Sequence, residues 1–157
     1  MNLQNESYEE RGMQLTENLR HVRLVELPAF LEREKGELIE SKRPFADYMR
    51  RKLREKGVLQ QNVFLAADIS EAYGYKLIAE EKHTRQRDTI LRLCLAAGFQ
   101  MEEVQETLIR YGMAPLFGRF ARDAVLIAAI SHEVFDLQEV NCLLTGCGQT
   151  PLVKDYE

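Results

Sequence analysis

The sequence lacks several features that mark secreted, membrane and disulfide-bonded proteins. It has three cysteines, an odd number without a CxxC spacing, which argues against a disulfide framework. No apolar run approaches the roughly 18 residues of a membrane span. The N-terminal segment, residues 1–12, is polar and acidic, unlike a secretory signal. We therefore expect a cytoplasmic protein that makes no membrane contact.

Catalytic and cofactor motifs are also missing. There is no GxGxxG, no P-loop and no nucleophile elbow. The three histidines, His21, His83 and His132, are scattered without ligand spacing, and Cys142 and Cys147 lack the partners of a tetrahedral zinc site. We expect those two cysteines to be small buried apolar residues. The sequence predicts no enzyme, no catalytic residue, no metal site and no cofactor.

The sequence has the pattern of an all-α protein. Its 157 residues are 45% hydrophobic and 29% charged, which is typical of a globular domain. Residues 1–12 are too polar to predict a packed structure, and residues 13–40 predict two short helices broken near Pro28. This acidic N-terminal arm, 1–43, either packs on the domain that follows or binds a partner or a second copy.

The central stretch, residues 58–80, predicts two short helices joined by a tight corner. Gln60 to Ala67 forms the first helix, Asp68 and Ile69 the corner, and Ser70 the N-cap of a second helix that ends near Glu80. Such a helix-turn-helix can place its second helix in the DNA major groove. The same geometry also occurs in proteins that never bind DNA.

Helices are predicted on both sides of this motif. One begins at Pro44 and ends at Gly57, with apolar residues at helical spacing. Two more run over about 87–97 and 102–111, and the first of these is apolar on nearly every side, as expected of a central helix.

The positive charge gathers on the segment that contains the motif. Residues 42–92 hold twelve Lys/Arg and seven Asp/Glu, a net of +5, whereas residues 1–41 carry −4 and residues 93–157 carry −5. A phosphate-binding surface needs charge of this sign, although a basic run can equally be the solvated face of one helix. The run concerned is Arg50, Arg51, Lys52, Arg54 and Lys56.

The C-terminal part contains a repeat. Residues 87–116 resemble residues 122–152, with Asp88 matching Asp123 at a spacing of 35 and Leu108 matching Leu144 at a spacing of 36. We interpret each repeat as an antiparallel helix pair with a glycine stop and a Pro-Leu exit, and the two aspartates as partners of helix dipoles rather than an acid pair. Two repeats are too few to stand alone as a solenoid.

These elements carry a resemblance to a known family. The residues concerned are Lys56-Gly57-Val58, Gln60, Ile69-Ser70, Tyr73, Lys76 and Leu77, with the 87–98 helix and the Met101-Glu-Glu-Val104 helix start. In this order and spacing, residues 45–111 resemble the five-helix DNA-binding domain of the lambda-repressor-like, or Xre, family. The whole chain is also similar to small bacterial proteins that add an N-terminal helical arm and a C-terminal helix pair. Tyr73-Gly74-Tyr75 and Arg122-Asp123-Ala124 are typical of that group.

The resemblance implies a fold and a function. The expected fold is an all-α arm (1–43), a repressor-like domain (44–116) and a C-terminal helix pair packed on it (117–157). The expected function is transcription regulation by binding duplex DNA, and the alternative is a helical module that binds proteins through a degenerate motif. Three residues depart from the family pattern: Gly74 replaces a buried Val or Ile, Glu80 replaces a glycine, and Glu71 places negative charge near the bases.

The motif assigns DNA contacts by position. Gln60 and Gln61 open the first helix, residues 71, 72, 73, 75 and 76 reach base edges from the second, and residues 82, 84 and 85 clamp the backbone. One of the two tyrosines is expected in the core. The assigned residues are Gln60, Gln61, Ser70, Glu71, Ala72, Tyr73, Tyr75, Lys76, Lys82, Thr84 and Arg85.

Overall fold

A computed structural model describes residues 8–153, and over this range the protein contains nine α-helices and no strand. The chain divides into two compact units, residues 1–41 and 42–157. We call the first the arm and the second the main body, and we describe each by itself. None of the described helices is long and apolar enough to cross a membrane.

The arm is a small helical hairpin. It contains α1 (Tyr8–His21) and α2 (Leu27–Arg33), with the short 3-10 turns η1 (Leu24–Glu26) and η2 (Lys35–Glu37). Phe30 is the buried side chain among its described residues, and the Arg33 guanidinium lies 5.4 Å from the Phe30 ring centroid. A hairpin with so small a core has little apolar burial to stabilise it.

Two details of the arm differ from the sequence prediction. Residues 8–12 belong to α1, so the unstructured segment predicted for 1–12 is wrong for those residues, and residues 1–7 lie outside the described range. The break between the two predicted helices falls at residues 22–26, a few residues before Pro28, which occupies the first turn of α2. Proline fits there because a first-turn residue needs no amide hydrogen. Packing of the arm on the main body stays a prediction.

The main body begins with the predicted helix and the predicted motif. Its first helices are α3 (Pro44–Lys56), α4 (Gln60–Ala67) and α5 (Glu71–Ile78). Pro44 starts α3, and Gly57 ends it in the left-handed conformation, as expected. The second motif helix ends at Ile78, two residues earlier than predicted, because Glu80 adopts a positive φ of 57°.

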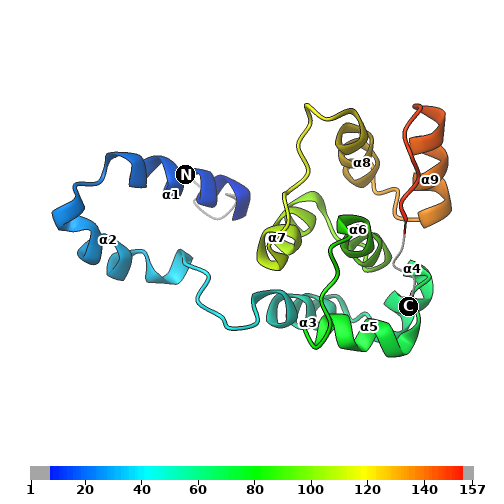
Figure 1. Cartoon of the computed structure of the whole chain (residues 1–157), viewed down its shortest axis with the longest axis horizontal. Coiled ribbons are helices and arrows are strands. Elements are labelled where there is room, and N and C mark those ends of the chain that lie inside the picture. The colour runs from blue at the N-terminus through cyan, green and yellow to red at the C-terminus, as the bar shows by residue number, and fades with distance from the viewer. Residues whose placement is uncertain (1–7, 154–157) are drawn as a thin grey trace. The chain divides into compact units, whose positions relative to one another are not determined.

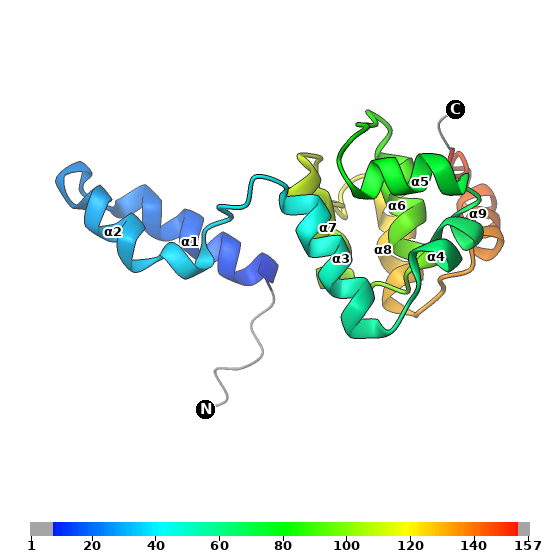
Figure 2. The same ribbon diagram turned by 90° about the horizontal axis from the view of Figure 1, so that it is seen from below.

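The two repeats complete the main body. The first contains α6 (Arg87–Ala96) and α7 (Met101–Tyr111), and the second contains α8 (Ala121–Ser131) and α9 (Leu137–Gly146). Helix α6 is central, as predicted: it contacts α4, α7 and α9, and all its residues from Asp88 to Leu95 are buried. In Figure 1, α3 and α5 lie below α6 and α7, and the second repeat lies above them; Figure 2 shows α3, α4 and α5 from below.

One continuous apolar core joins the motif to both repeats. It extends from Phe45 and Met49 of α3 through Leu91 of α6 to Leu144 and Leu152 of the second repeat. Leu108 and Leu144, which match in the repeat, are both fully buried. The prediction that both leucines are buried is therefore confirmed.

The exposure of the cysteines corrects one expectation. Cys142 and Cys147 are exposed, whereas Cys94 is buried. Cys142 lies on the side of α9 that faces away from Val140 and Leu144, its buried residues, and Cys147 is the C-cap that follows the last residue of the helix. Helical periodicity could have shown this for Cys142, because position 142 is out of phase with 140 and 144, but not for Cys147, whose position is in phase with them.

Candidate functional site

The corner between α4 and α5 is held by three local features. Asp68 adopts a left-handed φ of 54° and ends α4, and Ser70 caps α5 with its hydroxyl, which accepts a hydrogen bond from the Tyr73 amide at 3.3 Å. The cap is the one that the sequence predicts. Between them, Ile69 is buried and fixes the corner on the core.

Arg92 of α6 braces this corner from inside. Its Nε donates to the Ala67 carbonyl at 3.0 Å, and its guanidinium lies 3.6 Å from the Asp68 carboxylate. A third contact, from Nη1 to the Leu152 carbonyl at 2.9 Å, ties the end of the second repeat to the same side chain. Burial lowers the pKa of Arg92, because desolvation disfavours the charged form, and the carboxylates of Asp68 and Asp88 oppose that shift. One side chain thus links the corner of the motif to the end of the second repeat.

Gly74 sets the distance between the two motif helices. It is buried, and a Cβ atom at this position would lie 2.4 Å from the Phe64 ring. The Phe64 ring also packs edge-on against Tyr75, with ring centroids 4.9 Å apart. The ring of Phe64 thus fills the space that a larger side chain at 74 would need.

One face of α5 is open to solvent. Glu71, Ala72, Tyr75 and Lys76 are exposed on it, and Gly74, Leu77 and Ile78 are buried on the other side. Tyr73 is half-buried against the core and Tyr75 is 44% exposed, so Tyr73 is the more buried of the two tyrosines. Four of the positions predicted to reach base edges, residues 71, 72, 75 and 76, are therefore accessible.

The first motif helix contributes its N-terminal end. Gln61 is exposed, Gln60 is half-buried, and the Gln61 side-chain amide lies 3.5 Å from a Glu71 carboxylate oxygen. The N-cap of α4 is Leu59, which offers no side-chain acceptor to the first turn. The first-turn amides of α4 therefore receive no side-chain cap and can donate to an acceptor from outside. Contact with a phosphate is the role that the sequence analysis assigns to this end of the helix.

The loop after α5 carries two further cations. Lys82 and Arg85 are exposed, and the Lys82 Nζ lies 5.8 Å from the Tyr73 ring centroid. Between them Thr84 is buried: its amide donates to the Tyr111 hydroxyl at 2.7 Å, and its own hydroxyl accepts from the Gln86 amide. Thr84 therefore anchors the loop on α7 and cannot reach a phosphate as the sequence analysis expected. The bond to Tyr111 is made by the backbone amide of residue 84, so the residue type at this position gave no signal of the anchoring role.

The basic run on α3 is only partly available. Lys56 Nζ lies 2.8 Å from the Glu103 carboxylate and Lys52 lies 3.8 Å from the same group, so these two lysines join α3 to α7. Arg50, Arg51 and Arg54 are exposed. The cationic surface of α3 is thus smaller than the sequence indicates.

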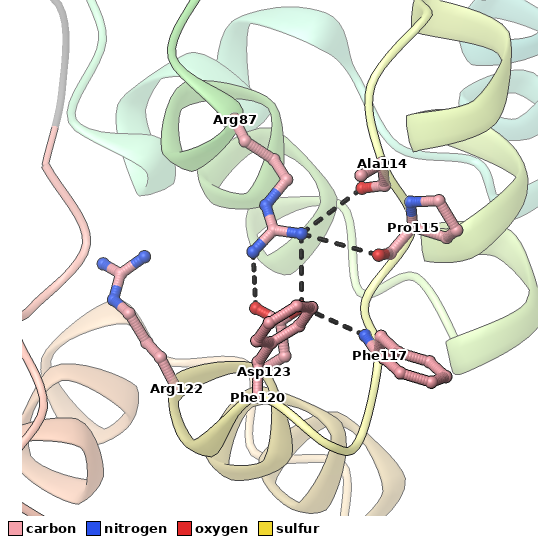
Figure 3. Close-up of a pocket in the computed structure, with 7 residues that line it drawn as sticks. All are labelled: Arg87, Ala114, Pro115, Phe117, Phe120, Arg122 and Asp123. Carbon is pink, nitrogen blue, oxygen red and sulfur yellow. Dashed lines mark hydrogen bonds and ion pairs between the residues drawn. The ribbon is translucent and has the colours of Figure 1, made fainter.

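The helix starts of the two repeats form a reciprocal ion-pair arrangement that the sequence analysis missed. Arg87 of the first repeat pairs with Asp123 of the second and donates to the Ala114 carbonyl at 3.3 Å, as Figure 3 shows. Arg122 pairs with Asp88 and donates to the Pro151 carbonyl at 2.9 Å. Each arginine thus binds the exit of its own repeat and the aspartate of the other.

The Arg87–Asp123 pair and Arg122 line a shallow pocket. Its volume is about 510 Å³, and Arg87, Asp123, Phe117 and Phe120 are on its wall (Figure 3). Both arginines there are already bonded to carboxylates and carbonyls, so the pocket has a structural explanation. The signal in the sequence was the repeated Arg-Asp doublet, which indicates a pair of charges but not which partners they choose.

Within the described part of the chain, no group of three or more His, Cys, Asp or Glu residues is placed to hold a metal ion. Burial raises the pKa of the Cys94 thiol to about 12, so that thiol is held in its unreactive protonated form.

No family model, no curated protein and no solved structure matches the chain.

Proposed function

We propose that this protein is a DNA-binding regulator of the Xre-like type, which binds duplex DNA through α4 and α5. The observation that carries the proposal is the open face of α5, where Glu71, Ala72, Tyr75 and Lys76 project from a helix fixed by its cap and its buried side. A recognition helix needs such a face at its N-terminal end. Lys82 and Arg85 follow on an anchored loop, in reach of a phosphate backbone that passes the end of α5.

Two departures from the family pattern have local compensations in this chain. Gly74, in place of a buried Val or Ile, is matched by Phe64, whose ring fills the vacated space. Glu80, in place of a glycine, takes the left-handed conformation at some cost in strain, and its carboxylate accepts a hydrogen bond from the Ala46 amide at 3.3 Å in the first turn of α3. These two compensations support the view that the helix pair keeps the helix-turn-helix geometry although its residues differ from the family pattern.

Glu71 is the least favourable feature for this proposal. Its carboxylate lies 3.5 Å from the Gln61 amide, which holds it across the start of both motif helices. A glutamate there can accept from the cytosine amino group but repels phosphates. The proposal therefore places Glu71 at a base edge rather than at the backbone.

The test is the salt dependence of binding to a labelled random duplex, followed by fluorescence anisotropy. If Lys76 and Lys82 both contact phosphates, the variant Lys76→Glu, Lys82→Glu should weaken binding at every sequence and flatten the slope of log K against log salt by about 2. Both side chains are exposed, so the unfolding midpoint should stay unchanged. The matched control is Lys42→Glu, Lys35→Glu, which makes the same charge change outside the motif.

A second candidate function is a protein-binding module. It is favoured by two exposed leucines at the first motif helix: Leu65 is 81% exposed and Leu59 is 66% exposed. Apolar side chains on this side suit a protein surface better than a phosphate backbone. Duplex affinity that is absent in the parent chain, or unaltered in the double reversal, would favour this candidate.

A further inference from the structure

The two repeats can be aligned residue by residue from their backbone. Gly98 and Glu133 both have a left-handed φ, of 68° and 58°, and Gln100 and Asp136 are the N-caps of α7 and α9. Residues up to 134 therefore match at a spacing of 35, since the Val134 amide donates to the Ala129 carbonyl as the Phe99 amide donates to the Cys94 carbonyl, and residues from 136 onward match at 36. The inserted residue is Phe135.

In the first repeat, α3 covers one side of α7. The contact runs along three α7 residues one turn apart: Glu103 binds Lys56 at 2.8 Å, Thr107 is fully buried, and Tyr111 stacks edge-on with Phe45 at a centroid distance of 4.8 Å. Since α3 starts at the Tyr111 end and finishes at the Glu103 end, it runs antiparallel to α7. Its apolar residues Phe45, Met49 and Leu53 are all buried.

In the second repeat, the matching side of α9 is uncovered. The equivalents of Glu103, Thr107 and Tyr111 are Glu139, Leu143 and Cys147, and all three are exposed. Leu143 and Cys147, with Ala124, Ala128 and His132 of α8, line an apolar groove of about 500 Å³.

Two of the groove's side chains are smaller than their equivalents in the first repeat. Ala128 matches Leu93, and Cys147 matches Tyr111; both first-repeat residues are buried. An occupant of the groove would thus need an apolar face at least as bulky as that of α3. No helix in the described part of the main body occupies this position.

We propose that this groove binds an amphipathic helix of a partner protein, in the position that α3 takes on the first repeat. The partner helix would carry bulky apolar residues at i, i+4 and i+8, the spacing of Phe45, Met49 and Leu53. Its last turn would be basic, because the carboxylate of Glu139 stands where that of Glu103 binds Lys56. This interaction is independent of the DNA surface on α5.

The probe is a fluorescein-labelled peptide of residues 42–58, which contains α3, titrated with the full chain by anisotropy. Saturable binding is expected. Ala128→Glu and Leu143→Glu each place a charge in the groove and should weaken binding at least about tenfold. Thr145→Glu, an exposed change on α9 that does not line the groove, should bind like the parent. A peptide with Phe45→Ala, Met49→Ala and Leu53→Ala should not bind.

Three results would overturn the proposal. The first is no saturable binding by the parent chain, and the second is undiminished binding by both groove variants. The third is a parent chain that sediments as a dimer and becomes a monomer in Ala128→Glu, since a second copy would then be the occupant. As a control for folding, at least one groove variant must show the same helical circular dichroism and the same melting temperature as the parent chain. Ala128 and Leu143 are both exposed, so neither variant places its charge in the buried core.

Discussion

Arg122 at the start of α8 donates two hydrogen bonds to Asp88 at the start of α6, at 2.7 and 2.8 Å, across 34 residues of chain. The same Asp88 carboxylate accepts the Val153 amide at 3.1 Å. The hydrogen bonds to Asp88 raise the pKa of Arg122, because they stabilise its charged form. This pair closes the second repeat onto the first.

Removing Arg122 should therefore destabilise the main body. In Arg122→Met the apolar stem is kept, while the Asp88 carboxylate, which is mostly buried, loses its counter-charge. Breaking a buried pair in this way costs roughly 3–5 kcal/mol, and partial exposure of Arg122 places the expected value near the lower bound. Urea denaturation measures it. Arg119→Met, an exposed arginine before the same helix, is the matched control, and an equal midpoint for the two variants would contradict the assignment.

Mutation of the matched leucines tests whether the second repeat belongs to the same cooperative core as the first. Leu108→Ala and Leu144→Ala should each cost roughly 2–5 kcal/mol through lost apolar transfer and a residual cavity. Both side chains are fully buried, but α9 has the open groove on one side, so Leu144→Ala should cost less. The measurement is the urea midpoint of each variant. If Leu144→Ala left the midpoint where it was, the second repeat would not belong to the cooperative core.

Gly74 should resist replacement although it lies inside a helix. Alanine is the better helix former by about 1 kcal/mol, yet its Cβ would meet the Phe64 ring at 2.4 Å. Gly74→Ala should then destabilise the chain by roughly 1–3 kcal/mol through overpacking. In a double-mutant cycle with Phe64→Leu, the two changes should couple, because a smaller side chain at 64 relieves the contact. Additive losses would show that the ring simply moves aside.

The three thiols should differ in reactivity. With iodoacetamide at pH 8, Cys142 and Cys147 should react in the folded chain, and Cys94 should react only after unfolding in urea. The thiolate is the reactive form, and burial both hides Cys94 and raises its pKa to about 12. Mass spectrometry of the alkylated peptides gives the measurement. Modification of Cys94 at the rate of the other two would indicate frequent opening of α6.

Local residue chemistry was enough to predict most helices and their ends. Pro44, Gly57, Ser70 and Gly112 act on the turn in which they lie, by a fixed φ, a left-handed φ or a side-chain hydrogen bond. The spacing of apolar residues likewise indicated the buried side of α3, since it depends only on helical periodicity. For the same reason, the exposed polar residues of α5 could be named in advance.

Tertiary structure alone decided which charged and polar residues became available. Thr84 and Lys82 are two residues apart in one loop, yet the first is buried under Tyr111 and the second is exposed. The matching repeats likewise gave no indication that α3 covers one and leaves a groove on the other. These outcomes depend on contacts between segments distant in sequence, whose geometry follows from the packing of the whole core rather than from the preferences of any local stretch.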